Sequence, residues 1–105
     1  MYRRYIGSDP ATKAMFDFAL CDIVGTWESY EGAPGIRIYR NLVHRKGGYC
    51  LEIYYNTHAV FHRSIKRYWG NIRYFDLYGF IGLAYDAGRD VLQLSLYGNY
   101  HRVEQ

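Results

Sequence analysis

The chain has 105 residues, which is the length of one domain and enough to bury a core without a disulfide or a metal. Half of the residues are hydrophobic and 19% are aromatic, which excludes a disordered chain, and the formal net charge of +3 is too small to indicate by itself a protein that binds polyanions. Thirteen tyrosines favour strands, because the ring packs on a pleated surface while the hydroxyl stays in water. We therefore expect a single domain over 1–105.

The N-terminal part predicts one helix. Residues 1–8 show no clear periodicity, and we expect a loose arm there. Asp9 can cap a helix and Pro10 fits its first position, and one apolar stripe follows at helical spacing, which predicts a helix over 10–21. The stripe consists of Ala11, Ala14, Met15 and Phe18.

The same segment carries no targeting signal that we recognise. Asp9 and Asp17 interrupt the apolar residues that a secretory signal would need, and no stretch approaches the ~20 apolar residues of a membrane span. We expect a cytoplasmic protein with no membrane association.

From Ile23 onward the hydrophobic period changes to two, which is typical of strands. Turn residues separate about eight such segments at spacings of 8–14 residues, and no connection is long enough for a parallel crossover. The pattern predicts a mainly β fold: an antiparallel meander over 23–103, closed as a β-barrel or open as a half-barrel, with the short N-terminal helix. The clearest strands are 36–40, 49–55, 80–86, 91–97 and 99–103.

Two hairpins have recognisable turns. Gly70-Asn71 is a two-residue loop that would set Trp69 opposite Ile72 and Tyr68 opposite Arg73. The second hairpin turns at "AGR" (87–89), and we expect Gly88 to adopt a positive φ there. After that turn, one apolar face is expected from Leu92, Leu94 and Leu96.

The two ends of the meander resemble those of the lipocalin-like (calycin) barrels. "GTW" opens the first strand and "GNYHR" forms the last one. The resemblance implies that Trp27 packs beneath Arg102, with Gly25 beside them. The physical reason is general, because first and last strands of a barrel are neighbours and an arginine over an indole face closes the base. We expect Gly25, Trp27 and Arg102 to have this structural role.

A longer resemblance covers about residues 21–104. The elements "W-x-S-x-x-G-x-P…I-Y-R", "L-A-Y-D…D-V-L" and "G-x-Y-x-R" are similar to those of a small uncharacterised domain family carried by conjugative transposons of Bacteroides-type bacteria. The resemblance implies a small barrel or half-barrel. It implies no activity and no catalytic residue.

No catalytic or metal-binding constellation is predicted, and no cofactor. His58 and His62 would lie about 13 Å apart in an extended chain, which is too far for one metal ion. Asp86 and Asp90 flank Gly88 as in a turn and lack the other ligands of a calcium loop. Cys50, His44 and Glu52 form no recognisable nucleophile motif, and we interpret Cys21 and Cys50 as buried, reduced thiols.

Two surfaces are candidates for binding. If several tyrosines point inward, the barrel would hold a small planar or amphipathic molecule between aromatic rings and hydroxyl groups. The tyrosines concerned are Tyr39, Tyr54, Tyr85 and Tyr97. The second candidate is the basic and aromatic hairpin 63–75, whose composition is typical of proteins that bind single-stranded nucleic acid. Its residues are Arg63, Lys66, Arg67, Tyr68, Trp69, Arg73 and Tyr74.

Each surface has a simpler interpretation. A barrel of this size is usually filled by its own side chains, and an exposed hairpin is stabilised by cross-strand pairs. Our first hypothesis is a non-enzymatic binding module, for a small apolar ligand or for a protein of the transposon. The alternative is binding of single-stranded nucleic acid through 63–75. An exposed aromatic patch on the hairpin would also suit self-association.

Overall fold

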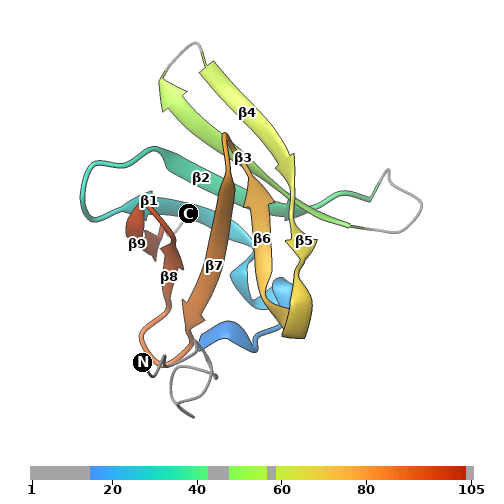
Figure 1. The fold of residues 1–105 in the computed structure, drawn as a ribbon. Helices are drawn as coiled ribbons and strands as arrows, with labels where there is room; N and C mark the ends of the chain where they lie inside the picture. Colours follow the sequence, from blue (N-terminus) through green and yellow to red (C-terminus); the bar gives the residue numbers. More distant parts are fainter. Residues whose placement is uncertain (1–14, 43–47, 57–58, 104–105) are drawn as a thin grey trace, which may run out of the picture.

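A single antiparallel sheet, nearly closed into a barrel, forms the protein (Figure 1). The structure is a computed structural model that describes residues 15–42, 48–56 and 59–103. Each strand pairs with its neighbour in the chain except at β4–β5, and β1 also pairs with β9, which confirms the predicted antiparallel meander. The strands are β1 (Gly25–Ser29), β2 (Gly35–Arg40), β3 (Tyr49–Asn56), β4 (Ala59–Ser64), β5 (Lys66–Arg67), β6 (Arg73–Asp76), β7 (Phe80–Asp86), β8 (Val91–Leu94) and β9 (Gly98–Arg102).

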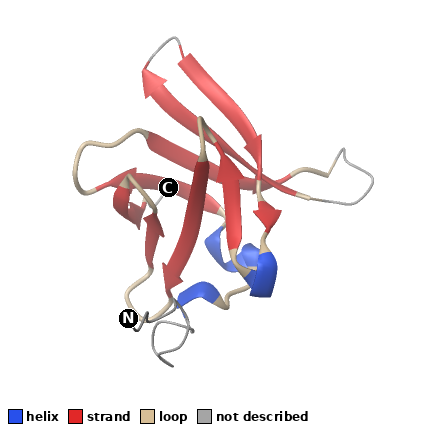
Figure 2. Cartoon of the chain, viewed as in Figure 1, coloured by secondary structure: helices blue, strands red, loops and turns tan. Residues whose placement is uncertain are grey.

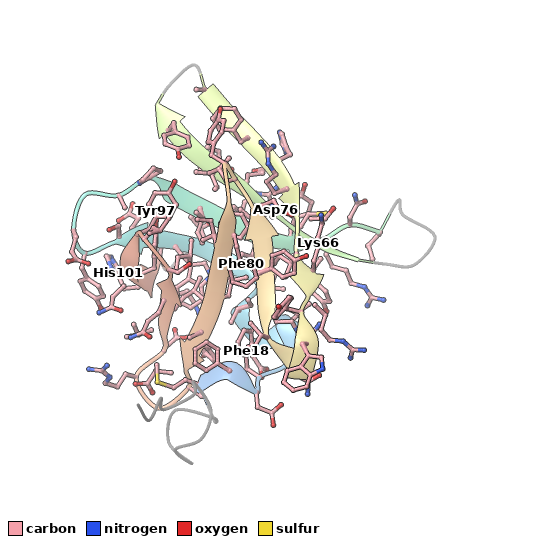
Figure 3. The ribbon with its side chains drawn as sticks, in the orientation of Figure 1. Phe18, Lys66, Asp76, Phe80, Tyr97 and His101 are labelled. Atoms are coloured by element: carbon pink, nitrogen blue, oxygen red, sulfur yellow. The ribbon has the colours of Figure 1, made fainter. Side chains whose placement is uncertain are left out.

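The two ends of the sheet meet at a bend in the chain. Only Ile65 separates β4, which pairs with β3, from β5, which pairs with β6. Before the bend, Arg63 on β4 reaches across to β6, where its Nε donates to the carbonyl of Asp76 at 2.9 Å. Its Nη1 donates to the carbonyl of its chain neighbour His62 at 2.8 Å. Lys66 forms an ion pair with the Asp76 carboxylate at 3.1 Å, and Figure 3 labels both residues. The sheet of the described residues has nine strands where the sequence predicted about eight, because this bend divides β4 from β5.

The inside of the barrel is filled by apolar side chains at alternate strand positions. Trp27 on β1 is register partner to Ile36 on β2 and to Arg102 on β9, so the inward face continues from strand to strand. Period-two alternation places these residues inside because successive side chains of a strand point to opposite faces. The fully buried large side chains are Trp27, Tyr100, Phe75, Ile23, Ile36, Ile38, Leu51, Ile53, Ile81, Leu83 and Leu92.

The predicted N-terminal helix is not confirmed. The arm 1–8 and the first part of the predicted helix, 10–14, lie outside the described residues. Beyond Phe16 the backbone is no longer α-helical, and Ala19 is extended. A 3-10 helix, η1 (Leu20–Ile23), then leads into β1. Tertiary packing decides this region, because the edge of the Phe18 ring packs on Tyr85 at 6.0 Å. Figure 2 shows the short helical segments together at one end of the sheet. No helix in the described part of the chain is long and apolar enough to cross a membrane.

The register predicted for the first hairpin is wrong by one residue. Arg67 pairs with Arg73, and the Tyr68 amide donates to the Ile72 carbonyl at 2.6 Å. Three residues therefore form the turn, in the 3-10 helix η2 (Trp69–Asn71). Gly70 and Asn71 both have positive φ, as their sequence suggests, but Trp69 joins them in the loop and is 85% exposed.

Two expectations for the second hairpin are also wrong. Gly88 is not among the residues with positive φ, and Asp90 takes this conformation instead with φ 54°. The Asp86 carboxylate accepts hydrogen bonds from the amides of Gly88 and Arg89 and so forms the turn with side-chain bonds. Leu96 is 88% exposed and has φ 75°, because β8 ends at Leu94 and the chain reverses before it reaches β9.

Candidate functional site

A groove of about 790 Å³ lies on the outer face of β7, β8 and β9. The outward positions of β7 that line the groove, Gly82 and Ala84, are small, and they alternate with the buried Ile81 and Leu83. The volume is within the range of small-molecule sites in proteins. Unlike the barrel interior, this place leaves room for a ligand.

The wall of the groove on the β6 side is aromatic. Phe80 stacks on Tyr74 with ring centroids 4.6 Å apart and planes 17° apart, and the edge of Tyr68 packs on Phe80 at 5.6 Å. Phe80, labelled in Figure 3, is 48% exposed and borders the groove together with Tyr68, Ile72 and Phe16. This cluster of rings presents apolar surface to solvent, which isolated soluble domains usually cover.

The other side of the groove carries polar but uncharged groups. Gln93 on β8 and Asn99 on β9 are register partners on the outer face, and both line the groove. Ser95 lies beside them, but its hydroxyl already accepts a hydrogen bond from the Gly82 amide at 2.8 Å. No hydrogen bond joins the side-chain amide of Gln93 or of Asn99 to another described residue. The groove therefore combines an apolar wall with two available amides.

The four tyrosines proposed as a ligand cavity do not surround one. Tyr39 and Tyr54 are on the outer face of the sheet, where Tyr54 donates a hydrogen bond to Glu52. Tyr85 is buried against Trp27 and donates to Asp90 at 2.7 Å. Tyr97, between β8 and β9, is near the end of the barrel opposite to the contact of Tyr85 with Trp27.

The hydroxyl of Tyr97 lies 2.5 Å from that of Tyr55. Burial, together with this hydrogen bond, raises the pKa of Tyr97 to about 12. Burial also raises the pKa of Tyr100, whose hydroxyl donates to the Pro34 carbonyl at 2.8 Å. These tyrosines belong to the framework of the barrel.

Gly25, Trp27 and Arg102 lie together at the end of the barrel formed by the start of β1 and the end of β9. The Arg102 guanidinium lies 4.4 Å above the Trp27 ring centroid and also donates to both carboxylate oxygens of Asp90, at 2.9 and 3.0 Å. Its remaining donors reach the carbonyls of Asp22 and Val24. Gly25 has φ 141°, a backbone conformation that favours glycine, and a Cβ there would also stand 2.9 Å from the Arg102 Nη1.

The residues of the basic hairpin are divided over different surfaces. Arg63 and Lys66 bind Asp76 and so help to close the sheet. Tyr68 and Tyr74 belong to the aromatic wall of the groove. Arg67 is exposed, Trp69 is 85% exposed, and Arg73 is half-buried with no hydrogen-bond partner for its Nε. The hairpin thus forms no continuous basic surface.

A polar cluster on β2, β3 and β4 was not predicted. Glu52 accepts hydrogen bonds from Arg37 at 3.0 Å and from Tyr54, and these hold the pKa of its carboxyl below the usual value. His62 Nδ1 lies 3.5 Å from the second Glu52 oxygen. The cluster lies on the outer face of the sheet, and none of its described residues lines the groove.

The remaining candidates for chemistry are separate from one another. His44 and His58 lie outside the described residues, and no group of three potential metal ligands occurs among the described ones. Cys50 is buried as expected, but Cys21 is exposed because η1 turns it outward, and neither forms a disulfide.

Sequence reasoning missed the groove, although a signal exists. In "FIGLAYD" the outward positions are Phe80, Gly82 and Ala84, which is an aromatic residue followed by two small ones. Small residues on the solvent face of a strand leave surface for a ligand or another backbone to approach. The amides of Gln93 and Asn99 could not be placed beside them without the strand register.

Comparisons with known proteins place the chain in a family but give no activity. The model of the family described as "Domain of unknown function, B. Theta Gene description (DUF3876)" matches residues 11–102, a range that includes all nine strands. A search of curated proteins and a search of solved structures each gave no match.

Proposed function

Because the chain belongs to the DUF3876 family, whose description assigns no function, we propose a function from geometry: a non-enzymatic module that binds a small apolar molecule in the outer groove of β7–β9. The observation that carries the proposal is the groove itself, about 790 Å³ in volume and lined mainly by apolar groups. Apolar surface is covered by a ligand more favourably than by water, at about 25 cal/mol per Å² removed from water.

The filled interior supports the choice of the outer groove. Trp27, Phe75 and Tyr100 occupy the centre of the barrel with essentially no exposure. The contact of Trp27 with Arg102 supports the proposed relation to lipocalin-like barrels. In our proposal the ligand binds on the outside of the barrel, because aromatic side chains fill its interior.

The test is titration with N-phenylnaphthylamine, a neutral dye that fluoresces in apolar surroundings. We expect saturable binding by the wild type and a loss of at least about tenfold in affinity for Gly82→Val, because the added side chain grows from the floor of the groove beside Phe80. Gly48→Val is the matched control, since a Cβ there meets nothing within 4 Å. Equal binding by all three proteins would contradict the proposal, provided that their thermal melts agree.

Single-stranded nucleic acid is the second candidate, favoured by one observation. Trp69 is 85% exposed in η2, close in sequence to the exposed Arg67. Stacking of a base on an exposed indole is worth ~1–3 kcal/mol. Quenching of Trp69 fluorescence by an oligothymidine, which weakens steeply with salt, would support this candidate, whereas binding in the groove should depend little on salt.

A further inference from the structure

The strand register places the two available amides of the groove side by side. Ala84, Gln93 and Asn99 form one row across β7, β8 and β9, since Ala84 pairs with Gln93 and Gln93 pairs with Asn99. Side chains at directly opposed positions of antiparallel strands start about 5 Å apart. The row therefore ends in two neighbouring primary amides that border the groove.

Each of these amides offers a hydrogen-bond donor and an acceptor together. Their natural complement is a group with an acceptor next to a donor, as on the edge of an adenine ring, which asparagine and glutamine bind through two hydrogen bonds. Because no described side chain pairs with Gln93 or Asn99, a ligand can use both of them. A purely hydrocarbon ligand would leave these amides without new partners.

The aromatic wall selects for a flat ligand. Phe80 is supported from behind by Tyr74, stacked at 4.6 Å, so that its orientation is fixed by the packing. A Cβ at Gly82 would stand 3.3 Å from the Phe80 Cε1, so glycine lets the edge of this ring lie close against the strand. A planar ring packed against Phe80 buries the most surface for its volume.

The charge of the lining selects against phosphate. None of the described residues that line the groove is charged, and its polar groups are the amides of Gln93 and Asn99 and the hydroxyls of Ser95 and Tyr68. Phosphate groups are usually bound by arginine, lysine or helix N-termini. A neutral ring therefore suits the groove better than a nucleotide.

We propose that the outer groove binds a neutral planar heteroaromatic ring of the purine class, packed against Phe80 and hydrogen-bonded through its edge to Gln93 and Asn99. This inference rests on the proposed function and adds the chemical class of the ligand. It assigns recognition of the ring edge to residues that the sequence analysis did not select.

The experiment compares adenosine with N6,N6-dimethyladenosine, whose two methyl groups remove the donor from the ring edge. Displacement of N-phenylnaphthylamine is measured for both nucleosides. We expect the dimethylated nucleoside to bind about tenfold more weakly, or worse, to the wild type, because one bidentate contact discriminates by ~1–3 kcal/mol. In Gln93→Leu and Asn99→Leu the preference for adenosine should disappear, and in the control Thr26→Val, on the outer face of β1, it should persist.

The outcomes separate this inference from the proposed function. If the dye binds but the two nucleosides compete equally, or neither competes, recognition of a purine edge is wrong and the apolar site remains. If the dye itself does not bind, both are wrong. If the leucine variants keep the preference for adenosine, the amides do not read the ring, and the assignment of Gln93 and Asn99 is overturned.

Discussion

The guanidinium of Arg102 lies over the indole of Trp27, with its Cζ 4.4 Å from the ring centroid, and joins the last strand of the sheet to the first. The indole Nε1 donates to the Ile23 carbonyl at 2.9 Å, so both side chains also hold the segment that enters β1. The same guanidinium binds Asp90, the residue directly before β8. One arginine thereby connects three strands and the chain before them.

Trp27→Ala should lower the free energy of unfolding by ~3–5 kcal/mol, because the substitution empties the largest fully buried position of the core. Trp69→Ala is the matched control. Its indole is 85% exposed, and the change should stay within about 0.5 kcal/mol. Urea unfolding followed by circular dichroism measures both. Equal stabilities of the two variants would show that the core is not organised around Trp27.

Gly25→Ala should destabilise the protein by about 1–3 kcal/mol, because Gly25 has φ 141° and a Cβ there would stand 2.9 Å from Arg102 Nη1. Gly48→Ala, at an exposed position with open space around it, serves as the control. Thermal melts of the two variants give the comparison. A Gly25→Ala protein as stable as the wild type would mean that the Arg102 guanidinium can shift away from residue 25 without loss of stability.

Asp90 should make stability depend on acid pH. The hydrogen bonds from Arg102, and then that from Tyr85, lower the pKa of the Asp90 carboxyl below its ordinary value of 3.8. A carboxyl whose folded pKa is lowered stabilises the fold above its unfolded pKa, and this contribution is lost as the pH falls below 3.8 through the folded pKa.

Asp90→Asn tests this directly, since asparagine also tolerates the positive φ of this position. At pH 7 the variant should be less stable than the wild type, and the difference should shrink as unfolding is measured at pH values below 3.8. If the difference in unfolding free energy between the variant and the wild type is the same at pH 7 and below pH 3.8, the role of the carboxylate is contradicted.

Tyr97 should make the stability of the fold fall as the pH rises into the alkaline range. Its pKa is raised from 10.0 to about 12, first by burial and then by the hydrogen bond with Tyr55. Its contribution to stability is therefore complete below pH 10.0 and is lost as the pH rises to about 12 and above. Ultraviolet titration of tyrosinate should show one fewer late-titrating group in Tyr97→Phe than in the wild type. An unchanged late phase in this variant would contradict the assignment.

Local pattern was sufficient to predict most of the fold. Alternation located the strands around Trp27, Ile36 and Leu51, and the turn residues set their antiparallel order. The resemblance at the two chain ends led us to expect the contact of Trp27 with Arg102, which the structure contains. These features depend on residues close in sequence or on the requirement that a barrel closes.

The errors arose where tertiary packing or turn chemistry overrides local pattern. Phe18 has helical spacing from Ala11, but it packs on Tyr85 in non-helical chain. Leu96 continues the spacing of Leu92 and Leu94, yet it lies in the turn between β8 and β9. The groove was missed for a different reason, because its row of Ala84, Gln93 and Asn99 exists only once the register of three strands is known.

The most direct test of the proposed site is an NMR titration of isotope-labelled protein with N-phenylnaphthylamine. The proposal predicts that the largest shifts of backbone amide signals fall on Gly82, Ser95, Gly98 and Asn99, around the outer groove. Inward-facing residues such as Leu51 and Phe75 should shift little. Largest shifts at these interior positions, or at Arg67 and Trp69 on the hairpin, would contradict a binding site on the outer face of β7–β9.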